Sequence, residues 1–126
     1  MAFYMVKAFA RFASRHRIPA LSLLAAARCV AAGDADADLG GGLYKQRVAR
    51  AGGGKSGGFR TLLAHRAGGH VFFLHGFAKN QRGNIDNREA RALRALGKVL
   101  HALSADQLTQ ALGAGALLEL NNDNHP

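Results

Sequence analysis

Lysine and arginine residues are concentrated in the stretch from position 39 to position 85, which contains no aspartate or glutamate. They are Lys45, Arg47, Arg50, Lys55, Arg60, Arg66, Lys79 and Arg82. These residue types bind phosphate groups and stabilise the negative charge that develops when a phosphate is attacked. We therefore expect an uncompensated cationic surface whose chemistry is directed at phosphates.

Three apolar-rich runs predict the strands that position these cations. In residues 43–50, alternation places Lys45 and Arg47 on one face and Tyr44 and Val48 on the other. Residues 59–66 and 70–77 predict two more strands, joined as a hairpin by the short glycine-rich segment 67–69. The last run is apolar on both faces and should be the most buried. With the glycine-rich loop 51–58, these runs predict a small antiparallel sheet.

Length and charge narrow the class of protein. The 126 residues predict one domain, over residues 1–120, followed by a disordered polar tail at 121–126. A net charge of +9 makes a polyanion the expected partner, with nucleic acid ahead of membrane lipid. Cys29 is the only cysteine, which excludes an intramolecular disulfide and fits a reducing cytoplasm. Histidines 65, 70 and 75 fall on different strands or faces, so neither a metal site nor a cofactor is expected.

The N-terminal third predicts one short strand and two helices. Residues 3–6 are expected to pair at an edge of the sheet, and residues 7–17 place Phe9 and Phe12 at helical spacing. Pro19 suits the start of a second helix that stops near Gly33. A basic segment followed by the apolar residues 18–27 also resembles a secretory signal. The amphipathic character of the basic segment and the charge of Arg28 argue against export, and the apolar run is too short to span a membrane.

The remaining motifs predict structure more than chemistry. Residues 34–38 alternate aspartate with alanine but lack the other ligands of a calcium loop, so we expect a solvated loop. Asp86 and Glu89 predict a capping box that opens a long helix, and residues 104–107 open a shorter one. Residues 117–120 are expected to add a short edge strand or to cover the core. The segment 54–56, Gly-Lys-Ser, is no P-loop because β-type sequence follows it where a helix should begin.

Three ordered blocks carry a family resemblance. They are Asp38-Leu39-Gly40-Gly41-Gly42-Leu43-Tyr44-Lys45-Gln46-Arg47-Val48-Ala49-Arg50, then Gly54-Lys55-Ser56-Gly57-Gly58-Phe59-Arg60-Thr61-Leu62-Leu63, then Gly76-Phe77-Ala78-Lys79-Asn80. With this spacing, residues 34–120 resemble the phage-related branch of the RelE/ParE superfamily, close to HigB-type toxins. The resemblance implies an α+β fold with N-terminal helices, a small antiparallel sheet and C-terminal helices, in agreement with the pattern of the residues.

The resemblance also implies an activity. RelE-like and HigB-like proteins are implied to be ribosome-dependent endoribonucleases that cut messenger RNA without a metal and are silenced by an antitoxin, expected here to be of the helix-turn-helix type. Cleavage of RNA through its own 2′-hydroxyl needs a base, cations for the extra negative charge, and an acid for the leaving oxygen. This sequence supplies the cations, and crowding among them would favour a lysine as the base.

Residue roles follow from the matched blocks. We expect Arg60 and Lys79 to contact the transition state and Lys55 to be a loop-borne contact or proton carrier. The residues expected to contact RNA or ribosomal phosphates are Lys45, Arg47, Arg50, Asn80 and Arg82.

Departures from the family pattern leave other functions open. Ser56 stands where relatives commonly carry a basic residue, Gln81 stands where an acidic one is common, and Tyr44 is the only tyrosine of the predicted sheet. A weakened toxin or an inactive relative would fit these departures. The alternatives are a ParE-like toxin directed at gyrase and a non-catalytic basic module that binds nucleic acid or a protein.

Overall fold

The computed structural model describes residues 1–50 and 58–121. The helices and strands, in chain order, are β1 (Phe3–Val6), α1 (Lys7–Arg15), α2 (Ala20–Ala31), β2 (Ala37–Asp38), β3 (Leu43–Val48), β4 (Phe59–Ala64), β5 (Val71–Ala78), α3 (Asn87–His101), α4 (Ala105–Gly113) and β6 (Leu117–Glu119). The predicted α+β class, with helices before and after the sheet, is confirmed. The predicted tail, beyond Asn121 itself, lies outside the described residues.

The sheet runs in the order β2-β3-β4-β5-β1-β6. From β2 to β5 the strands are antiparallel, as expected, but β1 is parallel to β5 and antiparallel to β6. Residues 3–6 thus pair with β5, the outer strand of the predicted sheet, as expected, but they do not form the edge themselves because β6 lies beyond them. Tyr4 and Met5 point to opposite faces and both are buried, which requires β1 to be covered on both sides. Of the two alternatives for residues 117–120, the short edge strand is the one that forms, as β6 over Leu117–Glu119.

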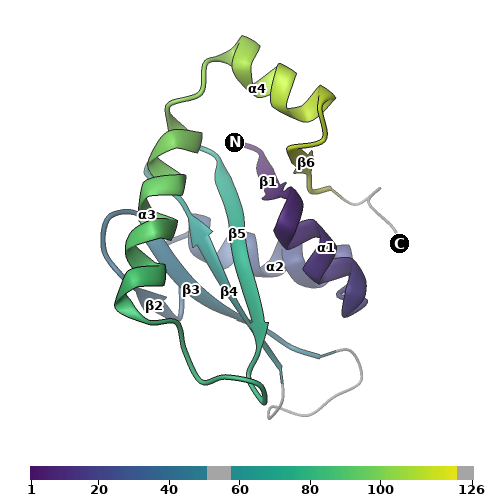
Figure 1. Ribbon diagram of the computed structural model, residues 1–126, viewed down its shortest axis with the longest axis vertical. Helices are drawn as coiled ribbons and strands as arrows, with labels where there is room; N and C mark the ends of the chain where they lie inside the picture. Colours follow the sequence, from purple (N-terminus) through teal and green to yellow (C-terminus); the bar gives the residue numbers. More distant parts are fainter. Residues whose placement is uncertain (51–57, 122–126) are drawn as a thin grey trace.

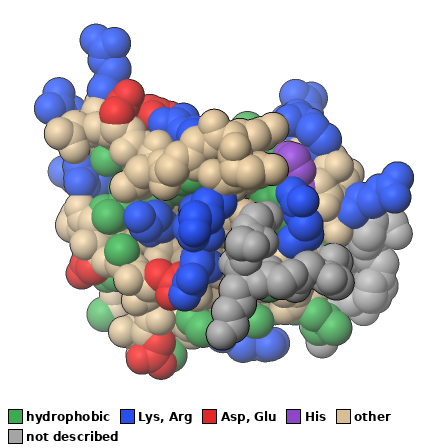
Figure 2. All heavy atoms as spheres, turned by 90° about the horizontal axis from the view of Figure 1, so that it is seen from below, with side chains coloured by type: hydrophobic (Ala, Val, Ile, Leu, Met, Phe, Trp, Pro, Cys, Tyr) green, Lys and Arg blue, Asp and Glu red, His purple; other side chains and the backbone are tan. Residues whose placement is uncertain are grey.

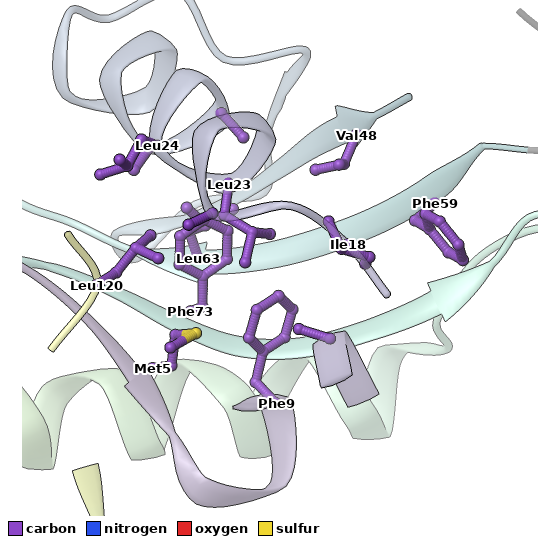
Figure 3. Packing of buried hydrophobic residues seen from close by; sticks show 14 of the residues in the cluster. Met5, Phe9, Ile18, Leu23, Leu24, Val48, Phe59, Leu63, Phe73 and Leu120 are labelled. Atoms are coloured by element: carbon purple, nitrogen blue, oxygen red, sulfur yellow. The ribbon is translucent and has the colours of Figure 1, made fainter. Parts of the chain in front are cut away.

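One core lies between the sheet and the two N-terminal helices. Phe9 of α1 stacks on Phe73 of β5 with 4.8 Å between ring centroids, and Leu23 of α2 packs in the same cluster with Leu63 of β4 (Figure 3). All four side chains are almost completely buried. Burial of this apolar surface fixes both helices on one face of the sheet.

A second core lies on the opposite face, beneath α3. Leu62, Phe72 and Leu74 point to this side and pack with Leu100 of the helix. Figure 1 shows α3 lying along one face, with α2 behind the sheet and α4 across one end. Among the described residues, the helices therefore cover both faces and leave open the end of the β3–β4–β5 segment that lies opposite α4.

The start of α3 is fixed beside that open end. Asp86 accepts a hydrogen bond from the backbone of Glu89, and the Glu89 carboxylate accepts one from the backbone of Asp86. This capping box satisfies two amides that the helix leaves without a partner, and it confirms the predicted start. Within the described ranges, no helix is both long enough and apolar enough to cross a membrane.

Candidate functional site

Strand register places the predicted cations side by side. Arg47 of β3 pairs with Arg60 of β4, and Arg60 pairs in turn with Phe77 of β5. One step further into the sheet, Lys45 pairs with Leu62, which pairs with His75. Leu62 and Phe77 belong to the core under α3. Residues paired across neighbouring strands point to the same face, so the cations and His75 also lie on the α3 face. We call Lys45, Arg47, Arg60, His75 and Phe77 the cationic face.

A hollow opens among these cations. Its volume is about 270 Å³, and it is lined by Lys45, Arg47 and Arg60 together with Asp36. Figure 2 views this end of the molecule and shows Lys and Arg side chains gathering there, with acidic side chains to one side. Three cations against one carboxylate leave the hollow positive, and side chains directly opposite on neighbouring strands are close enough to contact one anion together.

Asp36 corrects the expectation of an uncompensated surface. Residues 34–38 were predicted to form a solvated loop, but Ala37–Asp38 form β2 on the free side of β3. The Asp36 carboxylate accepts a hydrogen bond of 2.7 Å from the Arg47 backbone and lies 3.6 Å from its Nε. Because the Arg47 side chain is 62% exposed, this ion pair is weak and leaves the guanidinium available to a phosphate.

Arg82 makes contacts within the fold that the sequence did not reveal. Its guanidinium donates two hydrogen bonds to Glu89, at 3.0 and 2.5 Å, and one of 2.9 Å to the carbonyl of Asn84. It also lies 5.4 Å from the ring centroid of Phe77. The hydrogen bonds from Arg82, with one from the Asp86 backbone, lower the pKa of Glu89 to about 2. Arg82 thus ties the segment after β5 to the start of α3.

Three of the other predicted residues lie just beyond the ends of the strands. The Lys79 amide donates a 3.1 Å hydrogen bond to the Gly58 carbonyl, which places the Lys79 backbone in the turn after β5 and beside the start of β4. Asn80 follows it in the turn, and both side chains are exposed. The Arg50 guanidinium lies 5.5 Å from the ring of Phe59, which faces the opposite core. Lys55 lies outside the described residues.

His75 is the residue on this face that sequence reasoning missed as a chemical group. It is half-buried, and its Nε2 is buried and has no hydrogen-bond partner among the described residues. Burial lowers its pKa, and the nearby Glu89 only partly opposes this shift. A neutral imidazole can accept a proton. His75 lies two residues before Phe77, so alternation along β5 predicts that both face the same side. From the sequence, this histidine was considered only as a metal ligand.

Across the described residues, no three His, Cys, Asp or Glu side chains come together as a metal-binding group.

Comparison with known proteins places the chain in a family. The family model described as "RelE toxin of RelE / RelB toxin-antitoxin system" matches residues 1–120. The chain belongs to the RelE toxin family. Membership implies that this RelE-family protein is the toxin of a toxin–antitoxin pair and that it has an antitoxin partner. Searches of curated proteins and of solved structures found no match.

Proposed function

We propose that this RelE-family toxin is a ribosome-dependent endoribonuclease that cuts messenger RNA and so inhibits translation. The observation that carries the proposal is the pairing of Arg47 with Arg60 on the cationic face, beside the ring of Phe77. Two guanidinium groups on neighbouring strands suit one phosphate, because each presents several donors in a rigid plane.

The reaction can be written with residues of this face. The ribose 2′-hydroxyl attacks the adjacent phosphorus and loses its proton, the bond from phosphorus to the 5′-oxygen breaks, and that oxygen takes up a proton. The products are a 2′,3′-cyclic phosphate and a 5′-hydroxyl. Arg47 and Arg60 would stabilise the extra negative charge on the phosphate oxygens. His75 or a neighbouring lysine, Lys45 or Lys79, would accept the first proton, and a second of these groups in its protonated form would donate a proton to the 5′-oxygen.

The finer assignments belong to the same proposal. They are the phage-related HigB-like branch, a helix-turn-helix antitoxin, action in the cytoplasm, and a role for Lys55 as a further contact to the substrate. The cytoplasmic location rests on Cys29 being the only cysteine, and the others rest on the three sequence blocks and their spacing.

Cleavage in a purified translation system tests the function. Wild-type protein should cut a reporter message within its reading frame, and only when ribosomes are present. Arg60→Ala should cut about 100-fold more slowly, which is the usual loss when one donor to a developing oxyanion is removed. Arg28→Ala is the matched control, because Arg28 is an exposed arginine of α2 on the far face of the sheet.

Two outcomes would contradict the proposal. Intact messages with normal translation would exclude an endoribonuclease, and full activity of Arg60→Ala would exclude this site. A DNA-damage response in cells, with translation unaffected, would indicate gyrase as the target instead.

A further inference from the structure

Two adjoining cavities lie at the other end of α3, away from the cationic face. One, of about 380 Å³, opens between α3 and the ends of β3 and β4, and its lining includes Arg94 and Lys98. The second, of about 410 Å³, opens between the β4–β5 turn and the start of α4. Arg66 and His101 line both. We call the two together the Arg66 double cavity; it shares no lining residue with the cationic face.

The double cavity is basic. Its lining contains no aspartate or glutamate. Arg66 and Lys98 are exposed at its rim, and neither takes part in an ion pair with an acidic side chain of the described residues. Arg94 differs, because it donates hydrogen bonds to the carbonyls of Leu39 and Gly40 and so holds the turn before β3.

His101 contributes a buried polar atom without a partner. Its ring packs edge-on against Phe72 with 5.2 Å between centroids, and its Nε2 has no hydrogen-bond partner among the described residues. Burial, followed by the charge of Arg66 and the neighbouring His65 and His70, lowers its pKa. A buried polar atom without a partner is unfavourable.

Helix electrostatics explain only part of this arrangement. Cations near the C-terminal end of α3 are favourable, and Arg66 donates a 3.2 Å hydrogen bond to the His101 carbonyl there. That bond occupies one donor of Arg66. It accounts neither for the two cavities nor for the unpaired nitrogen of His101.

The walls of the double cavity indicate what kind of anion it suits. They include Leu93, Leu100, Leu103 and Leu108, so apolar surface lies directly beside the basic rim. Phe72, the phenylalanine of the lining, is fully buried and offers no face on which a nucleotide base could stack, and the other two rings of the lining, His70 and His101, are half-buried. An amphipathic segment with acidic and apolar side chains complements both features.

We propose that the Arg66 double cavity binds an acidic, amphipathic segment of a protein partner, with carboxylates at Arg66 and Lys98 and apolar side chains on the leucines. The antitoxin implied by the family is the expected source of this segment. The site is independent of the endoribonuclease chemistry, because it lies at the opposite end of α3.

Fluorescence anisotropy on the full chain tests this surface with two probes. One is a labelled synthetic amphipathic helix of leucine and glutamate, and the other is a short labelled single-stranded RNA. Arg66→Gln/Lys98→Gln should weaken binding of the peptide about tenfold, since charge-assisted contacts are lost. The control, Arg28→Gln/Arg91→Gln, removes the same charge from exposed helix positions outside both cavities.

The two pairs of variants separate the possible outcomes. Affinity for the peptide should fall in the double variant Arg66→Gln/Lys98→Gln alone. Affinity for the RNA should fall equally in both double variants. The proposal is overturned if the wild-type chain does not bind the peptide or if both pairs weaken it equally. A loss specific to RNA in the Arg66/Lys98 pair would instead make this a nucleic-acid surface. Thermal melts check folding, and the single variant Lys98→Gln serves if the pair unfolds.

Discussion

At the scale of single residues, Gly76 decides how closely α1 approaches the sheet. A β-carbon at this position would lie 2.5 Å from the ring of Phe12. Gly76→Ala should therefore destabilise the fold by about 1–3 kcal/mol, the usual cost of overpacking. Denaturant unfolding measures the loss. Gly83→Ala is the control and should change stability by less than about 0.5 kcal/mol, because nothing lies within 4 Å of a β-carbon there.

In the double variant Gly76→Ala/Phe12→Leu, the leucine side chain is shorter than phenylalanine and leaves room for the added β-carbon. This variant should therefore recover part of the lost stability. If Gly76→Ala unfolds at the same denaturant concentration as wild type, the packing of α1 in this structure would be wrong.

The same scale shows what local sequence could and could not predict about the site. Alternation correctly placed Lys45 and Arg47 on one face, because side chains of a strand alternate whatever the partner strand. It could not predict that Arg47 lies opposite Arg60, since register depends on how two distant segments pair. The sequence did not reveal Asp36 and Glu89 as ion-pair partners of Arg47 and Arg82 for a related reason. Both acidic residues lie outside the acid-free stretch and approach these arginines only through tertiary structure.

At the scale of elements, the end of α1 is a helix stop built without glycine. Arg17 has φ of 53°, the left-handed conformation that disfavours side chains other than glycine. The amide of Ile18 donates to the Ala13 carbonyl at 2.9 Å, and that of Arg17 donates to the Ser14 carbonyl at 3.1 Å. These two bonds form a Schellman motif, in which glycine is the usual residue at this position.

Arg17→Gly should therefore stabilise the protein by about 0.5–1 kcal/mol, because glycine adopts this conformation without strain. Thermal and denaturant unfolding measure the gain. Arg11→Gly, an exposed position inside α1, should have the opposite sign and cost about 1 kcal/mol. Equal destabilisation by both changes would rule out strain at Arg17.

Element order was predictable to the extent that each element has a local signal. The helix spacings, the Asp86 capping box and the three apolar runs all predicted elements that form. The parallel pairing of β1 with β5 was not predictable, because it joins residues 3–5 to residues 71–73. The register shift in β5 was missed too: Leu62 pairs with His75 and Leu63 pairs with Phe73, and no local pattern marks the unpaired Leu74.

At the scale of the whole molecule, positive charge gathers at both ends of α3. The cationic face lies beside its start, and the Arg66 double cavity lies beside its end. Under the two proposals made above, RNA and a protein partner would approach different ends of the helix. Each end also contains one half-buried histidine, His75 or His101, so the two sites share a response to acid.

That shared response predicts that the fold loses stability as the pH falls. Burial is the main cause that lowers the pKa of both His75 and His101 below the ordinary value of 6.5. Below pH 6.5 the unfolded chain therefore binds protons that the folded protein does not, and the free energy of unfolding decreases until the folded-state pKa values are reached. Glu89 does not change this pH dependence between pH 5.5 and pH 8. Its pKa is lowered from 4.5 to about 2 on folding, so its contribution to stability is fully present above pH 4.5 and is lost only at lower pH.

Thermal unfolding at pH 8 and at pH 5.5 measures the effect. The melting temperature of wild type should be lower at pH 5.5, and the difference should shrink in His75→Gln/His101→Gln, since glutamine does not titrate in this range. Each single variant should remove part of the difference, because the two histidines lie at opposite ends of α3 and act independently. A melting temperature equal at the two pH values, or a difference unchanged in the double variant, would show that neither histidine is buried as a neutral imidazole.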